Sequence, residues 1–380
     1  MDVDDGYDYE RFKGQKISIN VYNWGEYISD GSEEDTMNVN KEFEKLTGIH
    51  VNYTTFASNE ELYAKLKSGG SSYDIIIPSD YMISRMAEEG MLEELDFTNI
   101  PNFSYIDEDF VKPMYDPENK FSVPYTWGIV GIIYNKTRVD PDDDLASWDI
   151  LWNPKYALDI LMFSNSRDAM GISLKRLGYS FNTTDEKQLR EAADELKKQK
   201  ELVQAYVMDE IFDKMGGGEA ALAPYYAGDA VTMMAENPDL CFVVPKEGTN
   251  RFVDAICIPK GAKNKEAAEM YINFLCETEV ALANCEYIGY STPHTGAFEE
   301  LDEEMRESVS YPSAEILANT EYFVNLPAAT NKLVDSLWTE ILSSNSEANQ
   351  WIMPVFLLLC VGLSLGITIH RKVKKRRGEY

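Results

Sequence analysis

The stretch "YDIIIPSDY", residues 73–81, places three consecutive isoleucines directly before a proline and a group of polar residues. A short, wholly apolar run of this kind is typical of a strand that is buried on both faces of a parallel sheet. The proline and the polar residues then mark the carboxyl end of the strand. This segment therefore predicts an inner strand of an α/β sheet.

Four segments lead up to this strand, and their patterns alternate between strand and helix. Residues 16–21 ("KISINV") and 49–56 ("IHVNYTTF") alternate apolar and polar side chains, as half-buried strands do. Residues 33–48 and 58–70 have helical spacing, and each of them ends in glycine. The order strand, helix, strand, helix, strand predicts an open α/β sheet covered on both sides.

Two later segments continue the α/β pattern. Residues 183–200 form a helical run that opens with a capping box at Thr183 and Glu186. Residues 264–277 place their apolar side chains on one face of a helix. We expect a helix over each of these segments.

Aromatic and polar side chains follow the first and the third predicted strands. Trp24 and Tyr27 come after the first strand, and Ser79 and Tyr81 come after the third. Ligands of open α/β sheets bind in the crevice outside the carboxyl ends of the strands. We therefore expect these four side chains to face one crevice although they are far apart in the sequence.

Length and charge narrow the class of protein. The 380 residues exceed the usual size of one hydrophobic core, so we expect two lobes or domains. The formal net charge of -30 repels nucleic acid and attracts small cations. Many acidic proteins are simply soluble, so the charge alone does not identify a ligand.

Neither a metal nor a cofactor is indicated by the sequence. The five cysteines form no CxxC pair, and we expect most of them to be buried free thiols. The three histidines are scattered, and the common nucleotide-binding and hydrolase motifs are missing. We expect a protein without a cofactor.

A membrane segment is expected near the carboxyl terminus. Residues 351–369 ("WIMPVFLLLCVGLSLGITI") contain no charged side chain, and as a helix they would span about 28 Å. Residues 370–380 are rich in Lys and Arg, which predicts a cytoplasmic tail. We expect a polar linker at 343–350 and the large acidic part on the extracytoplasmic side of the cell membrane.

The amino terminus raises the question of export. Residues 1–15 are acidic and lack the positive and apolar regions of a signal peptide. We expect the sequence to be a fragment, a processed form, or the end of a longer polypeptide such as a permease fusion.

A set of ordered motifs resembles one known family. The motifs "YNWGEY", "VPYTWG", "SWDILWNPKY", "VVPKEG", "IPKGAKNKEAAEMYINFL" and "IGYSTP" occur in this order between residues 22 and 293. Together they resemble the spermidine/putrescine-binding proteins of polyamine ABC importers. The resemblance covers roughly residues 17–340, and the ordered set is much more specific than any single motif.

The resemblance implies a type II periplasmic-binding-protein fold, an α/β fold in which a ligand cleft lies between two lobes. Crossover segments would lie near residues 122–128 and 253–259. The expected lobes are residues 16–125 plus 256–305 for lobe 1, and residues 126–255 plus 306–342 for lobe 2.

The resemblance also implies a function without catalysis. Such a protein captures putrescine or spermidine outside the membrane and delivers it to an ABC permease that works with an ATPase subunit. Polyamines carry ammonium groups on an apolar chain, so their recognition requires carboxylates and flat aromatic walls.

Nine residues match the binding positions of the family. The resemblance assigns Asp168 and Asp254 to ammonium groups and Ser79 to a polar contact. It leaves Glu26 as a rim or surface charge. The expected aromatic walls are Trp24, Tyr27, Tyr81, Tyr226, Phe252 and Tyr290.

The sequence departs from the family pattern at several of these positions. Asn165 stands where better-known members carry a second acid, and Phe323 replaces a late polar contact. Tyr226 and Phe252 occupy positions where some members have Trp. These departures leave the preference between spermidine and putrescine open.

Two other functions compete with polyamine capture. Adjacent tyrosines such as Tyr225 and Tyr226 could supply phenolate ligands to ferric iron in a binding protein of the same fold. A hydrolase could use Asp168 and Asp254 as acid and base, although no nucleophile motif lies near either of them.

Overall fold

The computed structural model describes residues 3–4, 6–69 and 72–344. The expected transmembrane helix 351–369, the basic tail 370–380 and most of the linker lie outside the described residues. Within the described ranges, no helix is both long enough and apolar enough to cross a bilayer.

Ten strands form one continuous mixed sheet. They are β1 Ser18–Trp24, β2 His50–Phe56, β3 Ile75–Ile76, β4 Ser122–Asn135, β5 Ile160–Phe163, β6 Val203–Val207, β7 Leu222–Tyr226, β8 Leu240–Val243, β9 Thr249–Cys257 and β10 Thr320–Tyr322. The order in the sheet is β2-β1-β3-β9-β4-β7-β5-β6, with β8 paired to β4 and β10 to β9. The first three strands are parallel, whereas β9 runs antiparallel to β3 and β4.

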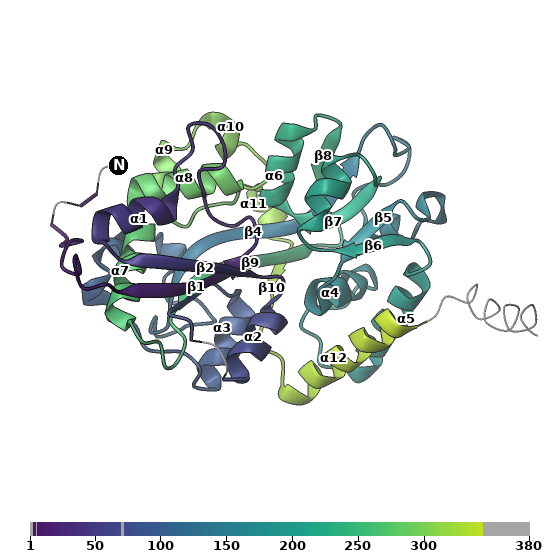
Figure 1. The fold of residues 1–380 in the computed structure, drawn as a ribbon. Coiled ribbons are helices and arrows are strands. Elements are labelled where there is room, and N and C mark those ends of the chain that lie inside the picture. The colour runs from purple at the N-terminus through teal and green to yellow at the C-terminus, as the bar shows by residue number, and fades with distance from the viewer. Residues whose placement is uncertain (1–2, 5, 70–71, 345–380) are drawn as a thin grey trace, which may run out of the picture.

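Helices lie on both sides of this sheet (Figure 1). They are α1 Val39–Thr47, α2 Asn59–Lys67, α3 Asp80–Glu88, α4 Ser166–Arg176, α5 Glu186–Gln199, α6 Ala227–Glu236, α7 Lys265–Leu275, α8 Thr278–Ile288, α9 Thr295–Glu300, α10 Glu303–Arg306, α11 Ala314–Leu317 and α12 Ala328–Ser343. The predicted order of β1, α1, β2, α2 and β3 and the predicted helix over 264–277 are confirmed.

The molecule consists of two halves that β4 and β9 join through the middle (Figure 1). One half carries β1 to β3 with α1 to α3 and α7 to α10, and the other carries β5 to β8 with α4 to α6. The last described helix, α12, packs on α4 and α5 of the second half. The two long strands therefore pass between the halves where the crossover segments are expected.

Local sequence signals place several helix ends correctly, but the helix expected over 33–48 begins only at Val39, where the Asn38 side chain caps it. Gly48 ends α1 in the left-handed conformation with a φ of 73°, and the Ser58 side chain caps the first turn of α2. The apolar run at 75–77 contributes only two residues to β3, because only Ile75 and Ile76 pair with β1.

The predicted start of α5 at Thr183 is wrong. The helix begins at Glu186, and the side chain of Asp185 accepts the hydrogen bond from the backbone N–H of Lys187. Thr183 instead donates to the side chain of Gln188 and accepts from the backbone of Asp185. The carboxylate next to the helix is a better cap than the more distant hydroxyl of the capping-box pattern.

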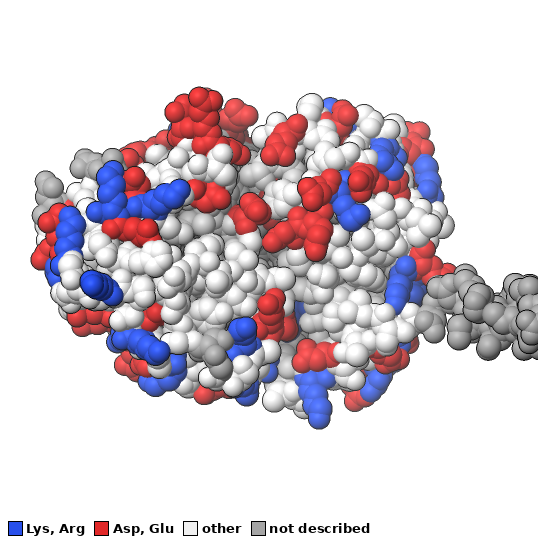
Figure 2. Space-filling model, viewed as in Figure 1, with Lys and Arg blue, Asp and Glu red and all other residues white. Residues whose placement is uncertain are grey.

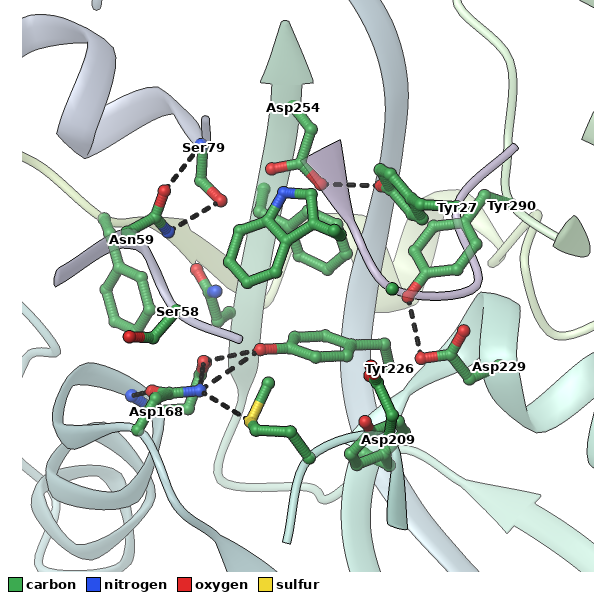
Figure 3. A pocket seen from close by; sticks show the side chains of 18 of the residues that line it. Tyr27, Ser58, Asn59, Ser79, Asp168, Asp209, Tyr226, Asp229, Asp254 and Tyr290 are labelled. Atoms are coloured by element: carbon green, nitrogen blue, oxygen red, sulfur yellow. Dashed lines mark hydrogen bonds between the residues drawn. The ribbon is translucent and has the colours of Figure 1, made fainter. Parts of the chain in front are cut away.

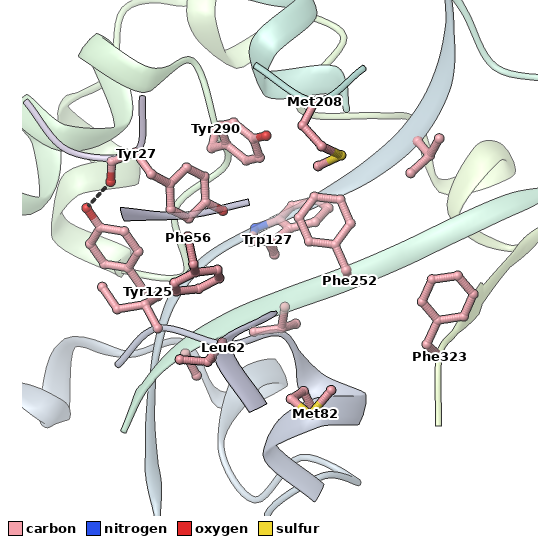
Figure 4. Close-up of a cluster of buried hydrophobic side chains, with 14 of the residues drawn as sticks. Tyr27, Phe56, Leu62, Met82, Tyr125, Trp127, Met208, Phe252, Tyr290 and Phe323 are labelled. Carbon is pink, nitrogen blue, oxygen red and sulfur yellow. Dashed lines mark hydrogen bonds between the residues drawn. The ribbon is translucent and has the colours of Figure 1, made fainter. Parts of the chain in front are cut away.

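Buried aromatic side chains connect the core with the space between the halves (Figure 4). Tyr27, Phe252 and Tyr290 are each 4 or 5% exposed. Tyr27 packs edge to face on Tyr290, with 4.8 Å between ring centroids. Because these rings are fixed by the core, they present rigid surfaces at the junction of the two halves.

The cysteine prediction is confirmed for the residues that the structure describes. Cys257, Cys276 and Cys285 are buried free thiols, and Cys241 is a half-buried one. Cys360 lies outside the described residues.

Candidate ligand-binding site

A single pocket between the two halves brings all nine expected binding residues together (Figure 3). Its space, including the open mouth, is about 680 Å³. The first half contributes the loop after β1 and the start of α3, and the second half contributes the start of α4 and the end of β7. The crevice predicted at the carboxyl ends of β1 and β3 is therefore present, and the second half covers it.

Strand β9 supplies one wall of the pocket. Asn250, Phe252 and Asp254 line it, since alternate side chains of a strand point to the same face. Phe252 meets Tyr226 edge to face, with 5.3 Å between ring centroids. Tyr290 lies 6.3 Å from Phe252, so rings from three separate elements form a continuous aromatic surface.

Asp254 carries an unsatisfied carboxylate oxygen. The residue is 4% exposed, and its Oδ2 accepts a hydrogen bond from the Tyr27 hydroxyl at 2.6 Å. Its Oδ1 is buried and has no hydrogen-bond partner in the described part of the chain. Burial raises the pKa of Asp254 to about 6, and the nearby hydroxyls of Ser79 and Tyr27 oppose the rise. A buried acceptor without a partner is costly, and a ligand cation would satisfy it.

Asp168 lies at another side of the pocket, in the first turn of α4 (Figure 3). Its Oδ2 accepts from the Tyr226 hydroxyl at 2.8 Å and from Asn165 Nδ2 at 2.9 Å. Burial raises the pKa of Asp168, and these two donors oppose the rise. Asn165, the departure from the family pattern, also caps α4 by accepting the backbone N–H of Asp168 at 2.9 Å.

Two wall residues have hydrogen-bonding contacts of their own. Ser79 receives a hydrogen bond from Asn59 Nδ2 at 3.0 Å, and its backbone N–H donates to Asn59 Oδ1 at 3.0 Å. The indole Nε1 of Trp24 is buried and, among the described residues, has no acceptor. The ring itself packs on Phe56, with 4.6 Å between centroids.

Three carboxylates of the pocket were not predicted from the sequence. Asp229 accepts from the Tyr290 hydroxyl at 2.9 Å, and Glu60 accepts from the Tyr81 hydroxyl at 2.9 Å. Asp209 lies on the same side of the pocket as Asp229 (Figure 3). Asp209 and Asp229 closely follow β6 and β7, so the rule about the carboxyl ends of strands could have identified them.

The pocket is strongly acidic. Five carboxylates line it, whereas no Lys or Arg does so in the described ranges. Acidic side chains also gather on the surface at the middle of the molecule, where the halves meet (Figure 2). Partial burial of its carboxylate raises the pKa of Asp209, and the nearby charge of Glu26 raises it further, which places the exposed Glu26 beside the pocket mouth. The local field therefore favours a cation.

The halves touch closely at this mouth. A Cβ atom on Gly25 would lie 2.0 Å from the Asp209 carboxylate, so the loop after β1 approaches the second half without room for a side chain. Gly228 has a similar role, since a Cβ there would lie 2.2 Å from the ring of Tyr290. The pocket is thus closed by contacts between backbone of one half and side chains of the other.

The tyrosine pair is poorly suited to ferric iron. Burial raises the pKa of both Tyr225 and Tyr226 well above the ordinary value for tyrosine, which disfavours the phenolate form. Tyr225 is 1% exposed and its ring stacks on Phe163. No group of three or more His, Cys, Asp or Glu side chains in the described part of the protein is arranged to hold a metal ion.

A two-lobed α/β fold with a buried, acidic and aromatic pocket between the lobes defines a solute-binding protein of the periplasmic-binding-protein type. The profile of the bacterial extracellular solute-binding proteins matches residues 71–320. The spermidine/putrescine-binding periplasmic protein of Escherichia coli is 38% identical over 316 residues, which cover 83% of this chain and 88% of that protein.

Solved structures agree with this likeness. A protein from Listeria monocytogenes that is assigned to a spermidine/putrescine ABC transporter superposes with a TM-score of 0.81 at 40% identity, covering 86% of this chain and 99% of the other. The substrate-binding protein of a spermidine/putrescine ABC transporter from Streptococcus pneumoniae superposes with a TM-score of 0.70 at 38% identity, covering 86% and 98%. The chain belongs to the spermidine/putrescine-binding protein family, whose members are binding proteins and not enzymes.

Proposed function

We propose that this chain captures a polyamine, putrescine or spermidine, on the extracytoplasmic side of a membrane and delivers it to an ABC permease with its ATPase subunit. The observation that carries the proposal is the charge of the pocket. Five carboxylates meet there without a lining Lys or Arg in the described ranges, and one oxygen of Asp254 has no partner. Such a pocket requires a cation, and its aromatic walls require an apolar body.

The carboxylates would receive the ammonium groups at separate places. Asp254 and Ser79 lie at one side of the pocket, Asp168 at a second, and Asp229 at a third, with the exposed Asp209 near it at the mouth (Figure 3). A chain of methylenes with an ammonium group at each end can reach two of these places, and a triamine can reach three. The proposed site can therefore accommodate either a diamine or a triamine.

The aromatic side chains would hold the methylene chain and the ammonium groups between them. In the proposed complex, Trp24, Tyr226 and Phe252 offer ring surface to the ligand, while Tyr27, Tyr81 and Tyr290 orient the carboxylates. A cation over a ring contributes about 0.5 to 2 kcal/mol, more where water is excluded. The ion pairs supply the required charge, and the rings add affinity for the chain.

Ligand capture would close two lobes around the pocket. The proposed lobes are residues 16–125 plus 256–305 and residues 126–255 plus 306–342, with β4 and β9 as the connecting strands. Hinge closure of this kind is widespread among periplasmic binding proteins. The closed form would then present a surface from both lobes to the permease.

A membrane anchor is part of the same proposal. Residues 351–369 are long enough and apolar enough to span a bilayer, and residues 370–380 carry the basic charge of a cytoplasmic end. This anchor would keep the binding domain close to the permease. Protease protection of the tail in sealed, right-side-out vesicles tests it, and cleavage of the tail from outside would reject this orientation.

A thermal-shift screen of the full chain tests the proposed ligand class. Putrescine, cadaverine, spermidine and spermine should each raise the melting midpoint if they bind the folded state, in order of their affinity. Butylamine and hexane-1,6-diol are matched controls, because the first has one ammonium group and the second has none. If the two controls raise the midpoint as much as the polyamines do, the pocket does not recognise paired ammonium groups.

A further inference from the structure

A second cavity lies behind β9, on the face of the strand that points away from the ligand pocket. Its space, including the mouth, is about 780 Å³. Val253 lines this cavity, whereas its neighbours Phe252 and Asp254 line the ligand pocket. Tyr81 and Phe323 line both, so these two rings form part of the wall between the cavities.

The walls of this back cavity are mostly apolar. They come from α3, from residues 109–115, from β9 and from residues 322–325. Two large apolar side chains stand at the surface there, Met114 at 75% and Tyr322 at 36% exposure. Exposed apolar groups around a cavity are typical of a binding site.

The carboxylates of the back cavity are already satisfied or exposed. Asp80 is 2% exposed, and its oxygens accept the backbone N–H groups of Tyr81 at 2.6 Å and Val253 at 3.3 Å. Asp109 is exposed to solvent. Neither carboxylate has a buried oxygen that lacks a partner, in contrast to Asp254.

Two guanidinium groups lie against rings near this cavity. Arg251 lies over the rings of Trp127 and Tyr322, at 4.7 and 5.3 Å from their centroids. Arg167 lies over Phe323 at 4.6 Å and over Tyr81 at 5.1 Å. Neither arginine forms an ion pair within 4 Å in the described part of the chain, so each retains its field toward the cavity walls.

Charges of both signs therefore lie around the back cavity. Arg167 also lies near the acids of the ligand pocket, whereas Arg251 is on the back face of β9. The ligand pocket has five acids along its walls, and the back cavity has two acids with two arginines beside its rings. A charged ligand would gain little here and would lose its hydration.

One polar group in the back cavity lacks a partner. The Tyr115 hydroxyl is buried, and no described residue accepts from it or donates to it. The residue itself is 9% exposed. A hydroxyl or carbonyl oxygen on a ligand would satisfy this donor.

We propose that the back cavity is a second binding site, which takes a small uncharged molecule with an aromatic or compact apolar body and one oxygen that bonds to Tyr115. The site is distinct from the polyamine pocket. It binds through ring contacts and one hydrogen bond, without an ion pair.

Three probes of one shape but different charge test the ligand class. They are 2-phenylethanol, 2-phenylethylamine and phenylacetate, whose binding to the full chain is followed by ligand-observed NMR. A probe is taken to bind in the back cavity if the variant Ser84→Phe abolishes its binding, because Ser84 lines the back cavity and not the ligand pocket. At this site the alcohol should bind at least about threefold more tightly than either ion, because an unpaired ion loses hydration. Equal or tighter binding of either ion would overturn the proposed class.

Two variants test the location. Ser84→Phe should weaken 2-phenylethanol binding at least tenfold by filling the cavity, whereas Ser68→Phe, at the exposed end of α2, should leave it unchanged. Tyr115→Phe should weaken it about threefold to tenfold by removing one hydrogen bond. Unchanged affinity in Ser84→Phe overturns the site. If Ser84→Phe does not fold, Tyr115→Phe tests the proposed site instead. Unchanged affinity of Tyr115→Phe for 2-phenylethanol would reject the site.

These tests remain separate from the polyamine proposal. Spermidine affinity should be unaffected by Tyr115→Phe, because Tyr115 does not line the ligand pocket. A protein that fails to bind polyamines can still bind 2-phenylethanol at the back cavity, and the reverse also holds. A loss of 2-phenylethanol binding only in variants of the polyamine pocket would show that the alcohol occupies that pocket, which would overturn the second site.

Discussion

The two faces of β9 differ in how their acids are offset. On the front face, Asp254 is buried with one unsatisfied oxygen in a pocket without a lining cation in the described ranges. On the back face, Arg251 stacks on aromatic rings, and the buried Asp80 is bonded to backbone N–H groups. Adjacent residues of one strand thus face a site that requires a cation and a cavity that does not. The difference shows that the balance of charges, more than the presence of acids, determines which ligand a cavity favours.

The largest expected effect comes from removing the uncompensated charge on the front face. Asp254→Asn should weaken spermidine and putrescine binding at least about tenfold, because a buried ammonium group would lose its carboxylate partner. The melting midpoint without ligand should not fall and at neutral pH should rise, since Asn still accepts from the Tyr27 hydroxyl and the variant removes a buried charge that disfavours the folded state. Isothermal titration calorimetry and thermal melts measure the two quantities.

The matched control for that variant is on the back face. Asp109→Asn removes an exposed carboxylate that lines the back cavity alone, so polyamine affinity should change less than twofold. Normal affinity in Asp254→Asn, or an equal loss in both variants, would refute the role assigned to Asp254.

The second prediction concerns pH, and it has opposite signs for binding and for stability. Burial raises the pKa of Asp254 from an ordinary value of 3.8 to about 6. Aliphatic ammonium groups stay protonated below pH 7, so polyamine affinity should fall as the pH drops below 6, approaching about tenfold per pH unit. The ligand-free protein should gain stability from Asp254 over the same decrease, because the folded state takes up a proton that the unfolded state does not yet bind.

Titration calorimetry and thermal melts between pH 7.5 and 5 test both signs. Burial also raises the pKa of Asp168 and of Asp229, so these carboxylates act in the same direction. The pH dependence of binding should be smaller in Asp254→Asn than in the parent protein. A polyamine affinity that stays constant from pH 7.5 to 5 would contradict an ion pair with a carboxylate of raised pKa.

The third prediction compares two rings on opposite faces of the sheet. Phe252→Leu removes an aromatic wall from the ligand pocket, and polyamine affinity should fall about threefold to tenfold through lost cation–π contact. Phe110→Leu removes a ring from the back cavity, and polyamine affinity should stay within twofold of the parent. Calorimetry on the two variants measures the contrast. If the two leucine substitutions have the same effect, the aromatic wall of the front face has no special role in recognition.

The strand and helix order of the first half could be predicted because each segment has a clear period and a clear end. The start of α5 could not, since the capping-box pattern at Thr183 competed with the Asp185 carboxylate nearer the helix. Periodicity depends on neighbours in the sequence, and it cannot decide between two caps two residues apart. The length of β3 depends on its partner strands, which the local pattern does not contain.

The candidate site was predicted in part for a similar reason. The resemblance supplied the nine expected wall residues, and all of them line one pocket. Asp209 and Asp229 were missed although both closely follow strands, and Glu60 was missed because its place in the pocket depends on a contact with Tyr81 from another element. The back cavity is assembled from four segments that are far apart in the sequence, so no local pattern indicates it.

The smallest expected effect concerns the mouth of the front pocket, where Asp209 is exposed. An exposed charge attracts a cation through water and is screened by salt, so it contributes mainly to the association rate. Asp209→Asn should lower polyamine affinity only about twofold to threefold at low ionic strength, and the difference should vanish near 0.5 M salt. Stopped-flow association at several salt concentrations measures this, with Asp254→Asn as the comparison.

The loss of affinity in Asp254→Asn should persist in salt because the ammonium partner of Asp254 is buried away from solvent. A loss at Asp209 that persists equally would place this carboxylate in direct contact with the ligand, so that the acids of the mouth and of the interior would act alike.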